Sequence, residues 1–131
     1  MRKQVEEWLY FSKIDLLSAK KLLEDAYLTQ SAAFHIHQSV EKCFKALIED
    51  LNLRVPKIHD LEKLLGIIIE HDIILKTNTE IISMINDVYI ETRYPNDQGL
   101  IPEGIPSIEF IQEIYSFAET LYNEINQLLD K

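Results

Sequence analysis

Apolar residues recur at helical spacing along most of this chain, and the clearest case is Ser31–Leu51. At about 100° per residue, one broad face of this stretch is apolar and consists of Ala33, Ile36, Val40, Cys43, Phe44, Leu47 and Leu51. The opposite arc is polar and consists of His35, Gln38, Glu41, Lys42, Lys45 and Glu49. The pattern predicts an amphipathic helix with Ser31 as its N-cap. A solvated outer face is the simplest interpretation of the polar arc.

Phe34 does not follow this division, because it projects beside Gln38 and Lys45, away from the apolar stripe. A large aromatic side chain at that position predicts a second buried contact, either with another helix or with another copy of the chain.

Further segments carry the same spacing and predict helices at Gln4–Ala26, His59–Asp72, Asn78–Arg93 and Ser107–Leu129. Pro56 interrupts the pattern before the third helix, and Pro95 ends the fourth. Tyr94–Ser107 holds three of the four prolines and two of the three glycines, which predicts a long loop. No segment alternates with a period of two residues. We therefore expect an all-α fold, an antiparallel up-and-down bundle of about five helices in one domain, 1–131.

Polar residues near the expected helix starts predict how those ends are stabilised. Asp60 lies near the first turn of the third helix, where a carboxylate interacts favourably with the helix dipole. Thr77, Asn78 and Thr79 compete as N-caps of the fourth helix, and Ser107 is the expected cap of the last.

Composition narrows the functional classes. With 13 basic and 22 acidic residues the net charge is −9, which disfavours tight non-specific binding to nucleic acid phosphates and suits a basic partner protein. The single cysteine, Cys43, cannot form an internal disulfide, and we expect it to be a small buried residue in a reducing cytoplasm. The apolar runs are short, so neither a signal peptide nor a membrane span is expected.

Metal and phosphate-loop chemistry is not expected. His35 and His37 are two residues apart on a helix and diverge, while His59 and His71 belong to another segment. The three glycines are too scattered to form a phosphate-binding loop, and we expect no bound metal and no cofactor.

Three motifs, in order, resemble those of HEPN domains. The first is the run Ala33-Phe34-His35, Gln38, Glu41-Lys42 and Lys45-Ala46-Leu47. The second is Pro56 with His59-Asp60-Leu61, and the third is Tyr89 with Arg93-Tyr94-Pro95. The resemblance covers nearly the whole chain. It implies a four-helix bundle core plus a short helix, a homodimer, and a nucleotide or nucleic-acid pocket in a groove near the dimer interface. It also implies a minimal nucleotidyltransferase as partner, in a toxin–antitoxin-like pair.

Many HEPN proteins are ribonucleases that use an Arg followed, after four to six residues, by a His. The His would transfer protons to and from the ribose and leaving oxygens, and the Arg would hold the scissile phosphate. Arg93 stands where that Arg is expected, but YPNDQGL follows it and no His does. Arg54 and His59 have the spacing, but Pro56 separates them and they precede the third helix, so we interpret this match as accidental.

The resemblance therefore favours a non-catalytic HEPN accessory protein. Its ligand-binding candidates, carried over by position, are His35, Gln38, Lys42, Lys45, His59, Tyr89, Arg93 and Tyr94. The alternative is a metal-independent ribonuclease toxin that combines Arg93 with a displaced His, either His35 or His59. Several candidates have structural explanations as well.

These structural explanations are pairing, capping and packing. Lys42 and Lys45 either hold phosphate or pair with Glu41 or Glu49. His59 binds the ligand, caps the third helix or donates to a backbone carbonyl. Tyr89 is expected to pack, and Arg93 has a salt bridge as its alternative role.

Overall fold

The computed structural model describes the backbone of residues 1–93 and 106–130, and the side chains of 1–89 and 106–130. Its helices are α1 (Lys3–Leu22), α2 (Thr29–Asp50), α3 (Leu61–Glu70), α4 (Glu80–Arg93) and α5 (Ile108–Leu129), with a 3₁₀ turn, η1 (Ala26–Leu28), between α1 and α2. The described part of the chain contains no strand. The all-α bundle predicted from the sequence is confirmed.

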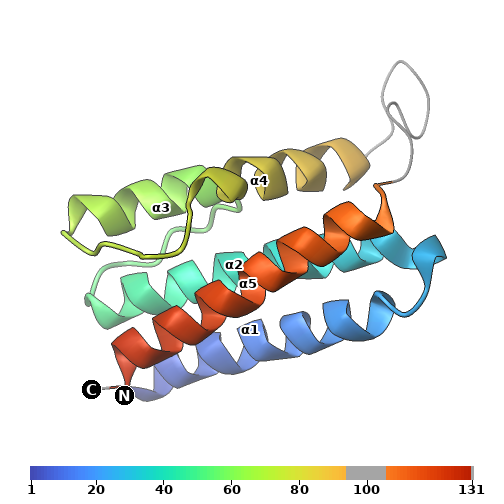
Figure 1. Cartoon of the computed structure of the whole chain (residues 1–131). Helices are drawn as coiled ribbons and strands as arrows, with labels where there is room; N and C mark the ends of the chain where they lie inside the picture. The colour runs from blue at the N-terminus through green and yellow to red at the C-terminus, as the bar shows by residue number, and fades with distance from the viewer. Residues whose placement is uncertain (94–105, 131) are drawn as a thin grey trace.

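Helix α2 is the centre of the bundle, because it packs against each of α1, α3, α4 and α5. Figure 1 shows α1 on one side of it, α3 and α4 in a row on the other, and α5 crossing in front of it. Helix α1 runs antiparallel to α2, as the short link through η1 requires. Among the described residues, no helix has both the length and the apolar content needed to cross a bilayer.

The central position of α2 corrects one expectation from the sequence. Glu41 and Lys45 were placed on a solvated arc, yet both side chains are buried, and His37 beside them has no exposed surface. The apolar stripe of α2, including Phe44 and Cys43, is buried as predicted. Since neighbours cover more than one side of α2, its polar groups lie inside the protein as well.

The ends of the second helix differ from the prediction. Helix α2 begins at Thr29, and Ser31 lies exposed within its first turn, so the predicted Ser31 cap is wrong. Helix α1 ends at Leu22 rather than Ala26, because Asp25 accepts a hydrogen bond from the Tyr27 amide and starts the 3₁₀ turn instead.

The caps of the later helices follow local chemistry. Asp60 is the N-cap of α3 and accepts hydrogen bonds from the amides of Glu62 and Lys63, so His59 does not take the capping role that was one of its alternatives. Asn78 accepts from the amide of Glu80 at the start of α4, and Ser107 caps α5 as predicted.

Loss of the α3 cap gives a first testable prediction. Asp60→Ala should lower the free energy of unfolding by about 1 kcal/mol, because two amides of the first turn lose their acceptor. Urea denaturation followed by circular dichroism measures this change. Asp60→Asn is the control and should retain most of the stability, since Asn is an equally good N-cap. An unchanged midpoint in Asp60→Ala would contradict the capping role.

Candidate functional site

Two carboxylates organise the polar groups of the predicted site. The first is the buried Asp15 of α1, which reaches across to α2. Its Oδ1 accepts from Nδ1 of His35 at 2.9 Å, and its Oδ2 accepts from Nζ of Lys42 at 2.6 Å. His35 and Lys42 are about two turns apart on α2, so this one carboxylate joins them from the neighbouring helix.

Glu41 is the second carboxylate and is nearly fully buried on α2. It accepts from Nζ of Lys45 at 2.9 Å and from Nδ1 of His59 at 3.1 Å. His59 belongs to the link between α2 and α3, so Glu41 attaches this link to the central helix. Of the two partners that the sequence offered Lys45, Glu41 and Glu49, the structure uses Glu41.

Aromatic rings of α1 lie next to the two lysines of α2. The ammonium of Lys42 is 5.9 Å from the ring centre of Phe11, and that of Lys45 is 5.7 Å from the ring centre of Trp8. Both distances allow a cation–π attraction. Each lysine therefore has both a carboxylate and an aromatic partner, which fixes it on the α1–α2 face.

A second aromatic group connects α2 to α4. The rings of His37 and Tyr89 stack with their centres 3.8 Å apart, and Phe34 stacks on the same tyrosine at 6.0 Å. Tyr89 is therefore buried and contacts two aromatic residues of α2. Phe34 remains 40% exposed, so within this chain the second buried contact predicted for it is only partial.

His37 is the most unusual titratable group of the cluster. Burial lowers the pKa of His37 from its ordinary value of 6.5 to about 4, although the nearby Glu41 opposes that shift. Its Nδ1 lies 3.8 Å from Oε1 of Glu41, which is too long for a hydrogen bond. His37 is therefore a neutral ring at physiological pH, held by stacking on Tyr89.

The core side of α2 also contains a polar contact with α1. Oγ of Ser12 donates to the carbonyl of Ser39 and lies 3.0 Å from Sγ of Cys43. Burial raises the pKa of the Cys43 thiol to about 12, so the thiolate is not formed at neutral pH. This agrees with the prediction of a small buried cysteine rather than a nucleophile.

The structure places four of the predicted binding residues in two groups, with His35 and Lys42 on Asp15, and Lys45 and His59 on Glu41. Gln38 is half-buried on α2. Tyr89 belongs to α4, and its ring stacks on that of His37. Helix α4 ends at Arg93, but the Arg93 side chain and all of Tyr94 lie outside the described residues.

The carboxylates themselves were missed as members of the site. Asp15 gave a signal in the sequence, because it is an acid enclosed by apolar residues in Ile14-Asp15-Leu16-Leu17. The sequence also indicated Glu41, because it is four residues from both His37 and Lys45 and so lies next to them on a helix. In the described part of the chain, no group of acids, histidines or cysteine is placed to hold a metal ion.

The cluster has two chemical properties that matter for function. Its two lysines are neutralised by Asp15 and Glu41, so a phosphate approaching this face must compete with buried carboxylates. In His35 and His59, Nδ1 forms the hydrogen bond to the carboxylate, and Nε2 is the second ring nitrogen that can exchange a proton.

The family of the chain follows from comparison with known domains. The HEPN domain model matches residues 5–128, from the first turn of α1 to the last turn of α5. The chain is a member of the HEPN family. Searches of curated proteins and of solved structures gave no significant match.

HEPN domains include both ribonuclease toxins and non-catalytic proteins, so family membership leaves the activity open. In this HEPN chain no His follows Arg93, since its four histidines are at 35, 37, 59 and 71. The imidazoles lie instead on α2, in the α2–α3 link and at the end of α3.

Proposed function

We propose that this HEPN protein is a non-catalytic accessory subunit. It binds a nucleotide or nucleic acid on the α1–α2 polar face and partners a minimal nucleotidyltransferase in a toxin–antitoxin-like pair. One observation carries the proposal: basic groups of α2 and of the α2–α3 link gather on two carboxylates, Asp15 and Glu41, and both lysines lie beside aromatic rings of α1. The absence of a His after Arg93 supports a binding role over catalysis.

The carboxylates set how such a ligand would bind. Because Lys42 and Lys45 are already paired, a phosphate gains only part of their charge, and binding should be of modest affinity and sensitive to salt. Lys42 is the more accessible of the two, since a quarter of its side chain is exposed, against 7% for Lys45. Lys42 is therefore the first contact we assign to the ligand.

Calorimetry with ATP, GTP and a short single-stranded RNA tests the binding role. Lys42→Met should weaken binding by roughly tenfold, as expected for loss of one charged contact. Lys20→Met is the matched control, because Lys20 is an exposed lysine of α1 outside the cluster. If none of the three ligands binds, and no nucleotidyltransferase co-purifies with the chain, the proposal fails.

The proposed accessory subunit acts as a homodimer, and Phe34 is the residue that supports this part. It is a large aromatic side chain at the surface, 40% exposed beside His35 and Tyr89. Light scattering should give twice the chain mass, and Phe34→Ser should shift the protein toward monomer. A scattering mass of one chain at all protein concentrations would contradict the proposed homodimer.

A second candidate function is metal-independent RNA cleavage, and the two carboxylate-bound histidines favour it. A carboxylate on Nδ1 fixes the tautomer of an imidazole and leaves Nε2 to transfer protons. RNA incubated in EDTA would then be cleaved, and the activity would be lost in Arg93→Ala and in either His35→Ala or His59→Ala. RNA that stays intact with the wild-type protein would exclude this candidate.

A further inference from the structure

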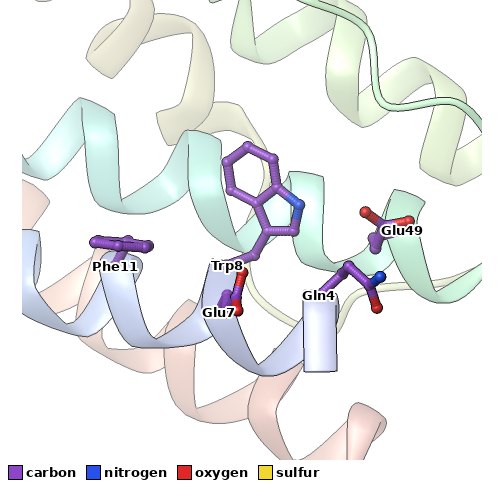
Figure 2. A pocket seen from close by; sticks show the side chains of 5 residues that line it. All are labelled: Gln4, Glu7, Trp8, Phe11 and Glu49. Atoms are coloured by element: carbon purple, nitrogen blue, oxygen red, sulfur yellow. The ribbon is translucent and has the colours of Figure 1, made fainter. Parts of the chain in front are cut away.

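A pocket of about 280 Å³ opens between α1 and α2, toward the C-terminal end of α2. Its lining residues are Gln4, Glu7, Trp8, Phe11 and Glu49. Figure 2 shows the Trp8 ring rising from α1 toward α2, with Glu49 and Gln4 on one side and Phe11 on the other. The pocket therefore combines two aromatic walls with two carboxylates and one amide.

The charge of this pocket is negative. Glu7 and Glu49 line it, and no basic residue is among its lining residues in the described part of the chain. Two lysines lie beside its aromatic walls, Lys45 at 5.7 Å from the ring centre of Trp8 and Lys42 at 5.9 Å from that of Phe11. Their charges are balanced by Glu41 at 2.9 Å and by Asp15 at 2.6 Å. An anionic ligand would meet two carboxylates here, whereas a cation would meet carboxylates and aromatic faces together.

A guanidinium of the chain already uses one of these carboxylates. Nη2 of Arg2 lies 3.9 Å from Oε2 of Glu49 and also donates to the Glu49 backbone carbonyl. Arg2 precedes α1, is itself exposed and is not part of the pocket lining. At 3.9 Å the carboxylate attracts the guanidinium electrostatically without a hydrogen bond, so the carboxylate oxygens of Glu49 still have room to accept from a second guanidinium.

We propose that this pocket receives an arginine side chain of a partner protein. A planar guanidinium stacks on an aromatic face and donates two parallel hydrogen bonds to a carboxylate, which a lysine ammonium does not do. Trp8 or Phe11 offers the face, and Glu49 or Glu7 offers the carboxylate. The net charge of −9 would also attract a basic partner surface before contact.

This inference rests on the part of the proposed function that gives the chain a protein partner, and it adds how that partner is recognised. It does not depend on nucleotide binding, which we assign to Lys42, about two turns of α2 before Glu49. The two can therefore fail separately.

Trp8 is the only tryptophan of the chain, so intrinsic fluorescence reports directly on the pocket. Titration with n-butylguanidinium, at concentrations too low to unfold the protein, should give a saturable change, and the neutral isostere n-butylurea should give none. Glu49→Gln and Glu7→Gln should each weaken binding by roughly three- to tenfold. Glu6→Gln, an exposed neighbour outside the pocket, should bind as the wild type does.

A peptide arm tests the protein source of the guanidinium. The acetylated amide of Ala-Arg-Ala should bind at least as tightly as n-butylguanidinium, and the same peptide with citrulline in place of arginine should not bind. An equal response to the urea or citrulline probe would overturn the inference, as would equal binding by both Gln variants and Glu6→Gln. The affinity of Glu7→Gln for ATP, measured by calorimetry, should match that of the wild type. Loss of guanidinium binding can therefore be distinguished from loss of nucleotide binding.

Discussion

Glu41→Gln is expected to lower the free energy of unfolding by about 3 kcal/mol, one of the two largest effects we predict for this chain. The variant removes the counter-ion of Lys45, whose side chain is only 7% exposed. It also leaves His59 of the α2–α3 link with an uncharged amide oxygen in place of the carboxylate. Breaking a buried ion pair on one side leaves an uncompensated charge, which costs about 3–5 kcal/mol. Urea denaturation at pH 7.5 measures the loss.

Two controls separate the buried charge from a general effect of mutation. Glu6→Gln changes an exposed carboxylate of α1 and should stay within about 0.5 kcal/mol of the wild type. The double variant Glu41→Leu/Lys45→Met removes both charges and should recover most of the stability, because apolar side chains of similar size replace buried ion pairs at little cost. A double variant as unstable as Glu41→Gln would show that Lys45 is not the cause.

The fold could be predicted because its determinants are local. The apolar spacing of each helix, Pro56 between α2 and α3, and the Ser107 hydroxyl that accepts from the Phe110 amide are all readable within a few residues. The start of α2 was missed because a 3₁₀ turn precedes it, and no side-chain cap marks Thr29. Ser31 has the chemistry of an N-cap, but the chain is already helical there.

The site could be predicted only in part, because its pairings join residues far apart in the sequence. Spacing placed His35, Lys42 and Lys45 on one side of a helix, and this is correct. Spacing could not show that Asp15, from another helix, holds two of these groups. It also could not show that other helices cover α2 on several sides. Because of that cover, Glu41 and Lys45, which spacing assigns to a solvated arc, are a buried pair.

In the proposed function, the same side chains would serve both stability and binding. A lysine on a solvated face would be free to hold a phosphate, whereas one paired with a buried carboxylate must give up part of that pairing. The α1–α2 face is thus a poor general phosphate site. It suits a ligand that leaves both carboxylate pairs in place, or a partner that adds charge of its own.

His37 is expected to make the chain lose stability as the pH falls from 7.5 to 4.5. Its pKa is about 4 in the folded protein and 6.5 in the unfolded chain, so the unfolded state binds the proton first. The stabilisation is complete above pH 6.5 and is lost as the pH falls toward 4. Over this interval the loss due to His37 is roughly 2–3 kcal/mol. Urea denaturation at several pH values measures it.

His37→Phe isolates this effect, because phenylalanine keeps a flat ring against Tyr89 but cannot bind a proton. Its unfolding free energy should fall less than that of the wild type over the same interval, by the same roughly 2–3 kcal/mol. The groups that face His37 are Glu41 on its own helix, Asn86 and Tyr89 on α4, and His59 in the link. All of these remain in the variant, so the difference in slope belongs to His37. His71→Gln, which changes an exposed histidine, should keep the wild-type slope. Equal slopes for wild type and His37→Phe would mean that the ring is protonated in the folded protein, with Glu41 as its counter-ion.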